Sequence, residues 1–211
     1  GSIPPELGNL SNLKHLDLTG TKVTSAGLVH LKELSNLESL ILVLIHINDS
    51  GLEHLQGLEN LKRLAAGGMR GGCKHITDDG LVYLKGLTRL ENLYMGTTQV
   101  SDGGLAHLKG LTNLKKLTLQ DTRITDAGLV HLKGLTNLKE LAVGYNRITD
   151  AGLIHLRSLA RLEGLSLEWC QKITDAGLEN LKGLRNLKKI VLSGTLATKP
   201  GIESLRPTLH P

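Results

Sequence analysis

Histidine recurs at one position of a repeated phrase, and histidine is the commonest metal-ligating side chain in proteins. The members of this column are His30, His54, His107, His131 and His155. A zinc ion needs its nitrogen ligands about 2.0–2.1 Å away. Packed helices that carry successive members would lie about 8–10 Å apart, so three of these histidines cannot reach one ion. We therefore expect neither a metal site nor a cofactor.

Cations and aspartates form two further columns with the same spacing. The cations are Lys32, Lys85, Lys109, Lys133, Arg157 and Lys182, and the aspartates are Asp49, Asp78, Asp102, Asp126, Asp150 and Asp175. A surface for single-stranded nucleic acid would place aromatic residues among its cations. Here each aspartate falls where a short helix would begin and each cation where it would end, which complements the helix dipole. The net charge of +5 is spread along the chain, and we expect no nucleic-acid partner.

Two local motifs could carry chemistry, and both have a simpler interpretation. The glycines of residues 67–72 have the spacing of a phosphate-binding loop, but Cys73 and Lys74 stand where such a loop needs Lys and Ser or Thr. Cys73 next to Lys74 and His75 could be a nucleophile of lowered pKa. Cys170 occupies the same repeat position, which favours a role in a turn. Since no acid, base and nucleophile converge, the sequence predicts that the protein is not an enzyme.

The sequence has no phenylalanine and only four aromatic residues: Tyr83, Tyr94, Tyr145 and Trp169. The last three occupy variable positions of L-x-L-x-x phrases, whose side chains point away from a leucine core. Large aromatic side chains often dominate the binding energy of protein interfaces. We therefore predict that Tyr145 and Trp169 anchor a protein or peptide partner, with Tyr94 and Glu168 beside them.

Other variable positions of these phrases carry mixed charges and one apolar patch. The charged residues that we expect to set specificity are Arg63, Lys116, Asp121 and Glu140. The apolar patch, which solvent does not favour, consists of Ile41, Val43 and Leu44. This patch could contact the partner or a second copy of the chain. We expect a monomer, with a homodimer through the patch as the alternative.

The elements that must position these side chains follow from an internal repeat. Gly-Leu pairs recur at intervals of 24, 29, 24, 24, 24 and 25 residues, and Gly201-Ile202 follows after another 24. The glycines of the pairs are Gly27, Gly51, Gly80, Gly104, Gly128, Gly152 and Gly177. The chain therefore consists of about eight units, and the 29-residue interval places a glycine-rich insertion at residues 65–72. The repeat also explains the 47 leucines.

Residues 114–138 are a typical unit. Alternation at residues 117–119 predicts a short strand. Thr125 and Asp126 can begin a helix, and Lys133 with Gly134 can end it, the glycine in a left-handed conformation. Between strand and helix, the units carry Thr, Asn or Cys at one turn position, whose side chain we expect to bond the neighbouring turn. No unit can bury its leucines alone, so we expect the units to stack.

The phrases L-x-x-L-x-L and ITDAGLxxLKGL resemble the leucine-rich repeat family over nearly the whole chain. The resemblance is to the 24–25-residue repeats of F-box-type proteins, including their cysteine-containing form C-x-x-I-T-D, whereas GSIPPELGNLSNLKHLDL is similar to plant-type repeats. It implies an α/β fold: a right-handed solenoid with a parallel β-sheet on its concave face and short helices on its convex face. We expect one domain over residues 1–211, with residues 1–12 as an N-terminal cap or half repeat and residues 202–211 as a C-terminal cap.

The resemblance further implies a non-enzymatic protein–protein interaction module. Two alternatives stay open: the substrate-recognition part of a ubiquitin ligase, and a designed, consensus-like scaffold without a natural partner. The longest apolar run, residues 40–45, is far shorter than the roughly 20 residues that cross a bilayer, so no membrane association is expected. Two isolated cysteines without cysteine-flanked caps favour a cytoplasmic location, and the start of the sequence leaves secretion open.

Overall fold

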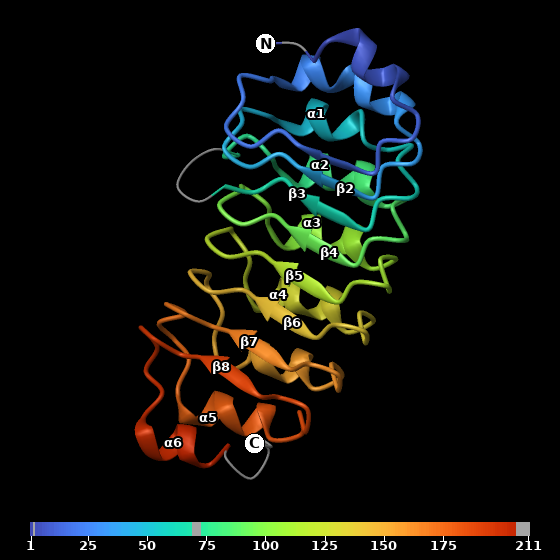
Figure 1. The fold of residues 1–211 in the computed structure, drawn as a ribbon. Coiled ribbons are helices and arrows are strands. Elements are labelled where there is room, and N and C mark those ends of the chain that lie inside the picture. The colour runs from blue at the N-terminus through green and yellow to red at the C-terminus, as the bar shows by residue number, and fades with distance from the viewer. Residues whose placement is uncertain (2, 69–72, 206–211) are drawn as a thin grey trace.

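The computed structural model describes residues 1, 3–68 and 73–205. Its eight strands form one parallel sheet in which each strand pairs with the next along the chain. The strands are β1 (His15–Asp17), β2 (Ser39–Ile41), β3 (Arg63–Ala65), β4 (Asn92–Tyr94), β5 (Lys116–Thr118), β6 (Glu140–Ala142), β7 (Gly164–Ser166) and β8 (Lys189–Val191). The strands lie side by side down the molecule, with the helical segments behind them (Figure 1). This arrangement confirms the predicted solenoid of strand–turn–helix units.

The helical segments are short, and most contain a 3-10 turn. The α-helices are α1 (Asp49–Glu53), α2 (Asp78–Leu81), α3 (Asp102–Leu105), α4 (Asp126–Leu129), α5 (Asp175–Leu178) and α6 (Lys199–Glu203). The 3-10 segments are η1 (Pro5–Asn9), η2 (Ser25–Glu33), η3 (Val82–Leu84), η4 (Ala106–Leu108), η5 (Val130–Leu132), η6 (Gly152–Leu156) and η7 (Glu179–Leu181). No helix among the described residues is long and apolar enough to cross a membrane.

The predicted left-handed stop at Gly134 is wrong. Helix α4 tightens into η5, and Lys133 follows with φ −53°, still in the right-handed region. The chain then leaves through a turn in which the Leu135 amide donates to the Leu132 carbonyl at 2.9 Å. A unit of 24 residues leaves room for barely two helical turns, so the tighter 3-10 geometry replaces a longer helix and its cap.

The leucine positions of every unit form a continuous buried core. Parallel pairing places Leu117 directly between Leu93 of the preceding strand and Leu141 of the next. The fully buried members of the unit around β5 are Leu114, Leu117, Leu119, Ile124, Leu129, Leu132, Leu135 and Leu138. Each buried leucine contributes about 1.5–3 kcal/mol relative to an exposed one. The core is therefore a set of aliphatic columns that run the length of the solenoid.

The aspartate column ties neighbouring units together, which corrects its interpretation as dipole complementation alone. The Asp126 carboxylate accepts hydrogen bonds from the Thr149 amide at 2.8 Å and the Thr149 hydroxyl at 2.6 Å, one unit further on. The same bonds join Asp49 to Thr77, Asp78 to Ser101, Asp102 to Thr125, Asp150 to Thr174 and Asp175 to Thr198. A Cβ at Gly152 would lie 2.2 Å from Asp126 Oδ1. From Gly80 onward, the recurrent glycine thus makes room for the aspartate of the preceding unit, whereas Gly51 faces Ser25.

The turn column differs in part from the prediction. The hydroxyls of Thr98 and Thr122 donate to carbonyls three residues earlier in their own units, at 2.8 and 3.0 Å. Asn146 and Cys170 reach the preceding unit: Asn146 Nδ2 donates to the Leu119 carbonyl at 2.7 Å, and Cys170 Sγ to the Val143 carbonyl at 3.6 Å. Thr122 also reaches the following unit, where its hydroxyl donates to Asn146 Oδ1 at 2.9 Å.

The two cysteines are buried turn residues. Cys73 Sγ donates to the Ile45 carbonyl of the preceding unit at 3.7 Å, and Cys170 Sγ donates to the Val143 carbonyl of its own preceding unit. Burial raises the pKa of the Cys73 thiol to about 11, and it also raises the pKa of Cys170. A buried thiol of raised pKa is a poor nucleophile at neutral pH, so the geometry supports the turn interpretation.

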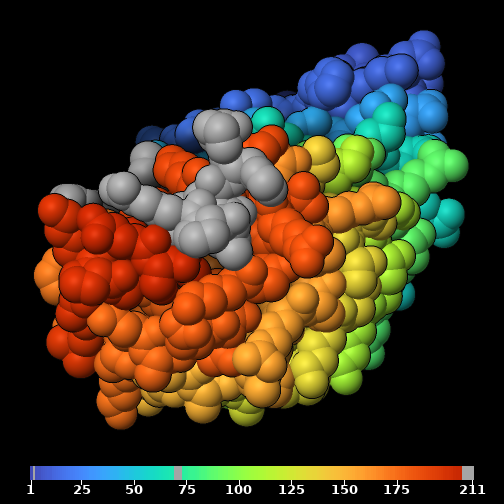
Figure 2. Space-filling model, turned by 90° about the horizontal axis from the view of Figure 1, so that it is seen from below, coloured from blue at the N-terminus to red at the C-terminus, as the bar shows by residue number. Residues whose placement is uncertain are grey.

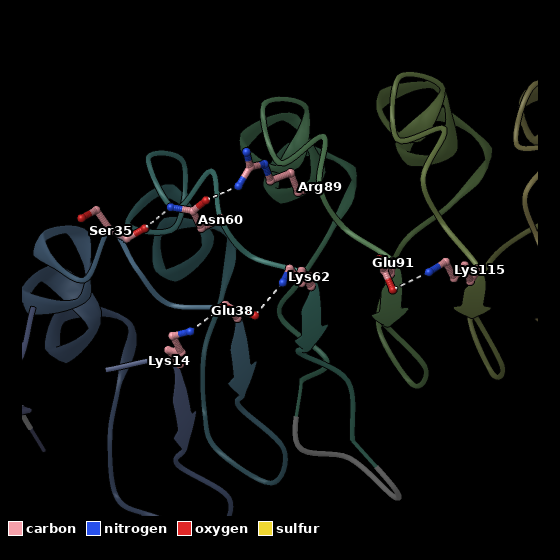
Figure 3. A network of polar contacts seen from close by, with 8 residues as sticks. All are labelled: Lys14, Ser35, Glu38, Asn60, Lys62, Arg89, Glu91 and Lys115. Carbon is pink, nitrogen blue, oxygen red and sulfur yellow. Dashed lines mark hydrogen bonds and ion pairs between the residues drawn. The ribbon is translucent and has the colours of Figure 1, made fainter. Parts of the chain in front are cut away.

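Polar side chains bridge the units at the amino ends of the strands (Figure 3). Glu38 is paired with Lys14 at 3.3 Å and with Lys62 at 2.7 Å, one unit to each side. Glu163 is held in the same way by Lys139 and Lys188 at 3.0 and 2.9 Å. These lysines lower the pKa of both glutamates. Each surface pair contributes little alone, but the series keeps this edge of the sheet in register.

The ends of the chain pack on the last leucines. Ile3 is buried at the front, where η1 lies against η2. At the back, Leu205 is buried. Residues 206–211 of the predicted C-terminal cap at residues 202–211 lie outside the described residues. Residues 69–72 of the predicted insertion also lie outside them. Seen from the C-terminal end, the units follow one another in sequence order, from α6 in front to the first units behind (Figure 2).

Candidate binding site

One repeat position combines an unusual backbone with large side chains. Just after the strand, at what we call the rim position, five non-glycine residues have φ between 53° and 58°. They are Leu44, Thr97, Asp121, Tyr145 and Trp169. Gly20 and Gly194 hold this position in the first and last units, with φ of 66° and 75°. The left-handed conformation lets the chain turn sharply out of the strand, and each rim side chain projects at the carboxyl edge of the sheet.

Tyr145 and Trp169 form a stacked pair at this rim. Their ring centroids are 6.1 Å apart and their planes differ by 26°. The indole then extends over the next turn, where a Cβ at Gly194 would lie 2.6 Å from Trp169 Cδ2. Both rings remain about half exposed, at 47% and 48%. The pair is thus held by neighbours on one side and presented to solvent on the other.

A hollow of about 750 Å³ crosses the sheet between β2 and β7, and we call it the concave groove. Its lining residues are Ile41, Val43, Arg63, Ala65, Gly67, Gly68, Tyr94, Gly96, Thr97, Thr118, Gln120, Asp121, Tyr145 and Glu168. The structure therefore brings together Arg63, Tyr94, Asp121, Tyr145 and Glu168, which the sequence proposed separately. The apolar Ile41 and Val43 belong to the same groove.

The other predicted site residues lie beside the concave groove. Lys116 and Glu140 line a smaller hollow of about 100 Å³ on the neighbouring part of the sheet. Leu44 is 49% exposed at the rim and does not line the groove. Trp169 lines a separate lateral hollow with Arg147 and Lys172, so its expected place on the concave face is corrected to the rim. Trp169 leaves the groove because its indole extends over the turn of the next unit at Gly194.

Tyr94 lies between two cations toward the β2 end of the groove. The Arg63 guanidinium carbon lies 5.3 Å from the centre of its ring, and Lys116 Nζ lies 5.9 Å away. Cation–π contacts of this kind contribute about 0.5–1 kcal/mol at exposed sites. Lys116 also forms an ion pair with Glu140 at 3.1 Å. The contacts order the side chains that surround Tyr94.

Acidic side chains surround Tyr145. Partial desolvation, and next the negative charge of Glu168, raise the pKa of the Tyr145 hydroxyl above its usual range, and Asp121 contributes in the same direction. Ser193 Oγ donates to Glu168 Oε1 at 3.3 Å. The two ends of the groove thus differ in charge, with cations near Tyr94 and carboxylates near Tyr145.

Sequence reasoning missed the glycines that let neighbouring turns approach each other closely beside the groove. A Cβ at Gly67 would lie 2.6 Å from the backbone of Gly96, and a Cβ at Gly144 would lie 2.7 Å from the Glu168 carbonyl. These glycines follow the last buried residue of their strands, so their recurrence was a visible signal. The glycines at positions 20 and 194 were the corresponding signal for the left-handed rim.

The histidine column lies on the helical side. Burial lowers the pKa of the half-buried His131, and the charge of Lys109 lowers it further. Among the described residues, no three His, Cys, Asp or Glu side chains gather in a way that could hold a metal ion.

The comparisons with known proteins agree with this architecture. Leucine rich repeat family patterns match residues 112–171, and residues 9–32 and 162–182. The structure is similar to an internalin (inlF) from Listeria monocytogenes, with 27% sequence identity and a TM-score of 0.76, over 99% of this chain and 56% of that one. It is also similar to internalin C2 of the same organism, at 24% identity and a TM-score of 0.73, over 97% and 96% of the two chains.

A leucine-rich repeat protein of Leptospira interrogans shares the fold at 19% identity and a TM-score of 0.65, over 99% of this chain and 62% of that one. The chain thus spans little more than half the length of the first internalin. No match is found among curated protein sequences. Proteins with this fold are typically non-enzymatic interaction modules. Together, the family patterns, the eight-stranded parallel solenoid and the shared structures establish that the chain is a leucine-rich repeat protein.

Proposed function

We propose that the protein is a non-enzymatic binding module that holds an extended segment of a partner protein in the concave groove, with Tyr145 and Trp169 as its anchors. The observation that carries the proposal is the residue choice at the rim position. Leu44, Tyr145 and Trp169 occupy, with large side chains, a left-handed backbone position that glycine fills in the first and last units.

This choice works against the stability of the fold. A left-handed conformation costs a non-glycine residue about 1–2 kcal/mol. Tyr145 and Trp169 also leave about half of their surface in water, so burial of the other half offsets only part of that cost. Strained positions of this kind cluster at functional sites. Aromatic anchors that gain their contacts only when a partner binds would account for both features.

The dimensions of the groove suit a peptide segment. Strands in a sheet lie about 4.8 Å apart, so the five intervals from β2 to β7 span roughly 24 Å. An extended chain advances about 3.3 Å per residue, and about seven residues would cross the groove. Its lining combines apolar Ile41 and Val43, aromatic Tyr94 and Tyr145, and charges at both ends. Mixed aromatic and polar composition is typical of protein interfaces.

The test is a selection from a randomised heptapeptide library displayed on phage, with the purified protein as the target. We expect enriched peptides that lose binding to a Tyr145→Ala/Trp169→Ala double variant by at least about tenfold, as hot-spot residues do. A Val130→Ala/Ile154→Ala double variant is the matched control, since it removes exposed apolar side chains from the helical side. Circular dichroism confirms that all variants are folded. Peptides that bind wild type and the aromatic double variant equally would refute the proposal.

A further inference from the structure

The Tyr145 end of the concave groove gathers two carboxylates around one aromatic ring. Asp121, Tyr145 and Glu168 come from three consecutive turns that backbone hydrogen bonds join. The Asp121 amide donates to the Gly144 carbonyl at 3.0 Å, and the Tyr145 amide donates to the Glu168 carbonyl at 2.6 Å. All three side chains line the groove. Their positions are therefore fixed by the sheet and not by a free loop.

The carboxylates of Asp121 and Glu168 have no cationic partner. In the described part of the chain, no Lys or Arg nitrogen lies within ion-pair distance of either group. The other glutamates of this sheet are paired, with Lys116 on Glu140 and two lysines on Glu163. After partial desolvation, the negative charges of Glu168 and Asp121 also raise the pKa of the Tyr145 hydroxyl, which places both carboxylates close to this side chain. A cation that joins two neighbouring carboxylates and an aromatic ring is attracted by all three.

We propose that this acidic and aromatic end of the groove binds the guanidinium group of an arginine in the partner segment, an inference that rests on the proposed function. A guanidinium is planar, stacks on aromatic faces and directs five N–H donors in its plane. It can lie against the Tyr145 ring while it donates to Asp121 and Glu168. Charge-assisted hydrogen bonds to both carboxylates would replace the missing ion pairs.

The opposite end of the groove gives the bound segment a direction. Arg63 and Lys116 flank Tyr94 there, next to the apolar Ile41 and Val43. A second basic residue would be repelled at this end, whereas apolar or acidic residues fit it. Complementary charges of this kind fix the register and orientation of a partner more than they raise its affinity. The partner segment should therefore carry its arginine at one end and apolar residues at the other.

The test uses N-acetyl-arginine methylamide as the probe and its neutral isostere, N-acetyl-citrulline methylamide, as the control. The sequence has a single tryptophan, so the indole N–H of Trp169, stacked on Tyr145, gives one reporter signal in an NMR titration. We expect the arginine probe to shift this signal saturably and the citrulline probe to bind at least about fivefold more weakly, because it lacks the charge.

The matched variants are Asp121→Asn/Glu168→Gln and Glu91→Gln. Asparagine tolerates the left-handed backbone of position 121, so the first variant removes charge and preserves shape. We expect it to weaken the arginine probe about tenfold, whereas Glu91→Gln, which changes a carboxylate at the amino ends of the strands, should leave it unchanged. Equal shifts with arginine and citrulline, or unchanged affinity in the Asp121→Asn/Glu168→Gln variant, would overturn the inference.

Failure of this inference is distinguishable from failure of the proposed function. Selected heptapeptides without a basic residue that still depend on Tyr145 and Trp169 would overturn the arginine site and leave the binding function intact. Saturable arginine binding that the Asp121→Asn/Glu168→Gln variant abolishes, without any enriched peptide, would support the cation site and refute the peptide groove.

Discussion

At the scale of single residues, the rim position serves both the fold and the surface. Its left-handed backbone turns the chain out of each strand, and Gly20 shows that the turn itself requires no side chain. Trp169 uses the same backbone to extend its indole over Gly194 and against Tyr145. The side chain at this position is therefore free to serve binding, at the cost of local strain.

A comparison of Gly194→Ala with Gly20→Ala separates the cost of backbone strain from the cost of a steric clash with Trp169. Both alanines would adopt a left-handed φ, so each should lower the free energy of unfolding by about 1 kcal/mol. Only at position 194 would the new Cβ collide with the indole ring, and overpacking of this kind costs about 1–3 kcal/mol more. Urea unfolding measures the difference, and the fluorescence of Trp169 should change only in Gly194→Ala. Equal effects of the two substitutions would show that the indole does not pack on Gly194.

At the scale of elements, the aspartate at the start of each helix joins that helix to the next unit. Asp78 accepts hydrogen bonds from the Ser101 amide and hydroxyl at 2.6 and 2.5 Å, whereas the neighbouring Asp79 is exposed in the same first turn. Both carboxylates thus interact with the helix dipole, but only Asp78 forms hydrogen bonds to the next unit. The dipole contribution of either is about 0.3–1 kcal/mol.

This difference predicts unequal effects in one helix. Asp78→Ala should lower the free energy of unfolding by about 2 kcal/mol, because it removes two hydrogen bonds to a charged acceptor and leaves the Ser101 amide without its partner. Asp79→Ala should cost only the dipole contribution, a few tenths of a kcal/mol. Urea denaturation of both variants checks the comparison. Similar losses would mean that the dipole, and not the bridge, explains the aspartate column.

At the scale of the whole molecule, each unit depends on its neighbours for its buried core, its polar contacts and its binding surface. The leucine columns, the aspartate bridges and the Lys–Glu–Lys pairs each connect one unit to the next. The concave groove needs strands from β2 to β7, so no single unit contains it. Stability and binding are therefore both properties of the stack, as expected for a solenoid.

The same contacts predict a loss of stability in acid. Hydrogen bonds and lysine charges lower the folded-state pKa values of Glu38, Glu163 and Asp175. Carboxylates of lowered pKa stabilise the fold above their ordinary pKa values, and this contribution disappears as the pH falls through the lowered values. The free energy of unfolding should thus fall progressively below about pH 5. A Glu38→Gln/Glu163→Gln variant should show a shallower decline in acid urea titrations, and an unchanged slope would contradict the assignment.

The sequence was sufficient to predict the strands and the aliphatic columns, because the 24-residue period places Leu93, Leu117 and Leu141 in register. It also indicated seven of the fourteen described residues that line the groove. It was not sufficient for contacts between units. The hydrogen bonds that Thr149 donates to Asp126 join residues 23 apart, and their geometry depends on how far one unit is rotated relative to the next. The groove depends on the same rotation, and Trp169 could be placed at the rim only once its φ was known.

The central claim is that the partner occupies the concave groove, and a hydrogen–deuterium exchange footprint tests it most directly. The probe is the tightest heptapeptide from the selection, added in excess to the wild-type protein. We predict slower amide exchange confined to the strand ends and rim turns from β2 to β7, including the segments that carry Tyr94, Tyr145 and Trp169. Protection that falls instead on the helical side, at α4, η5 and η6, with the rim turns unchanged, would contradict the account.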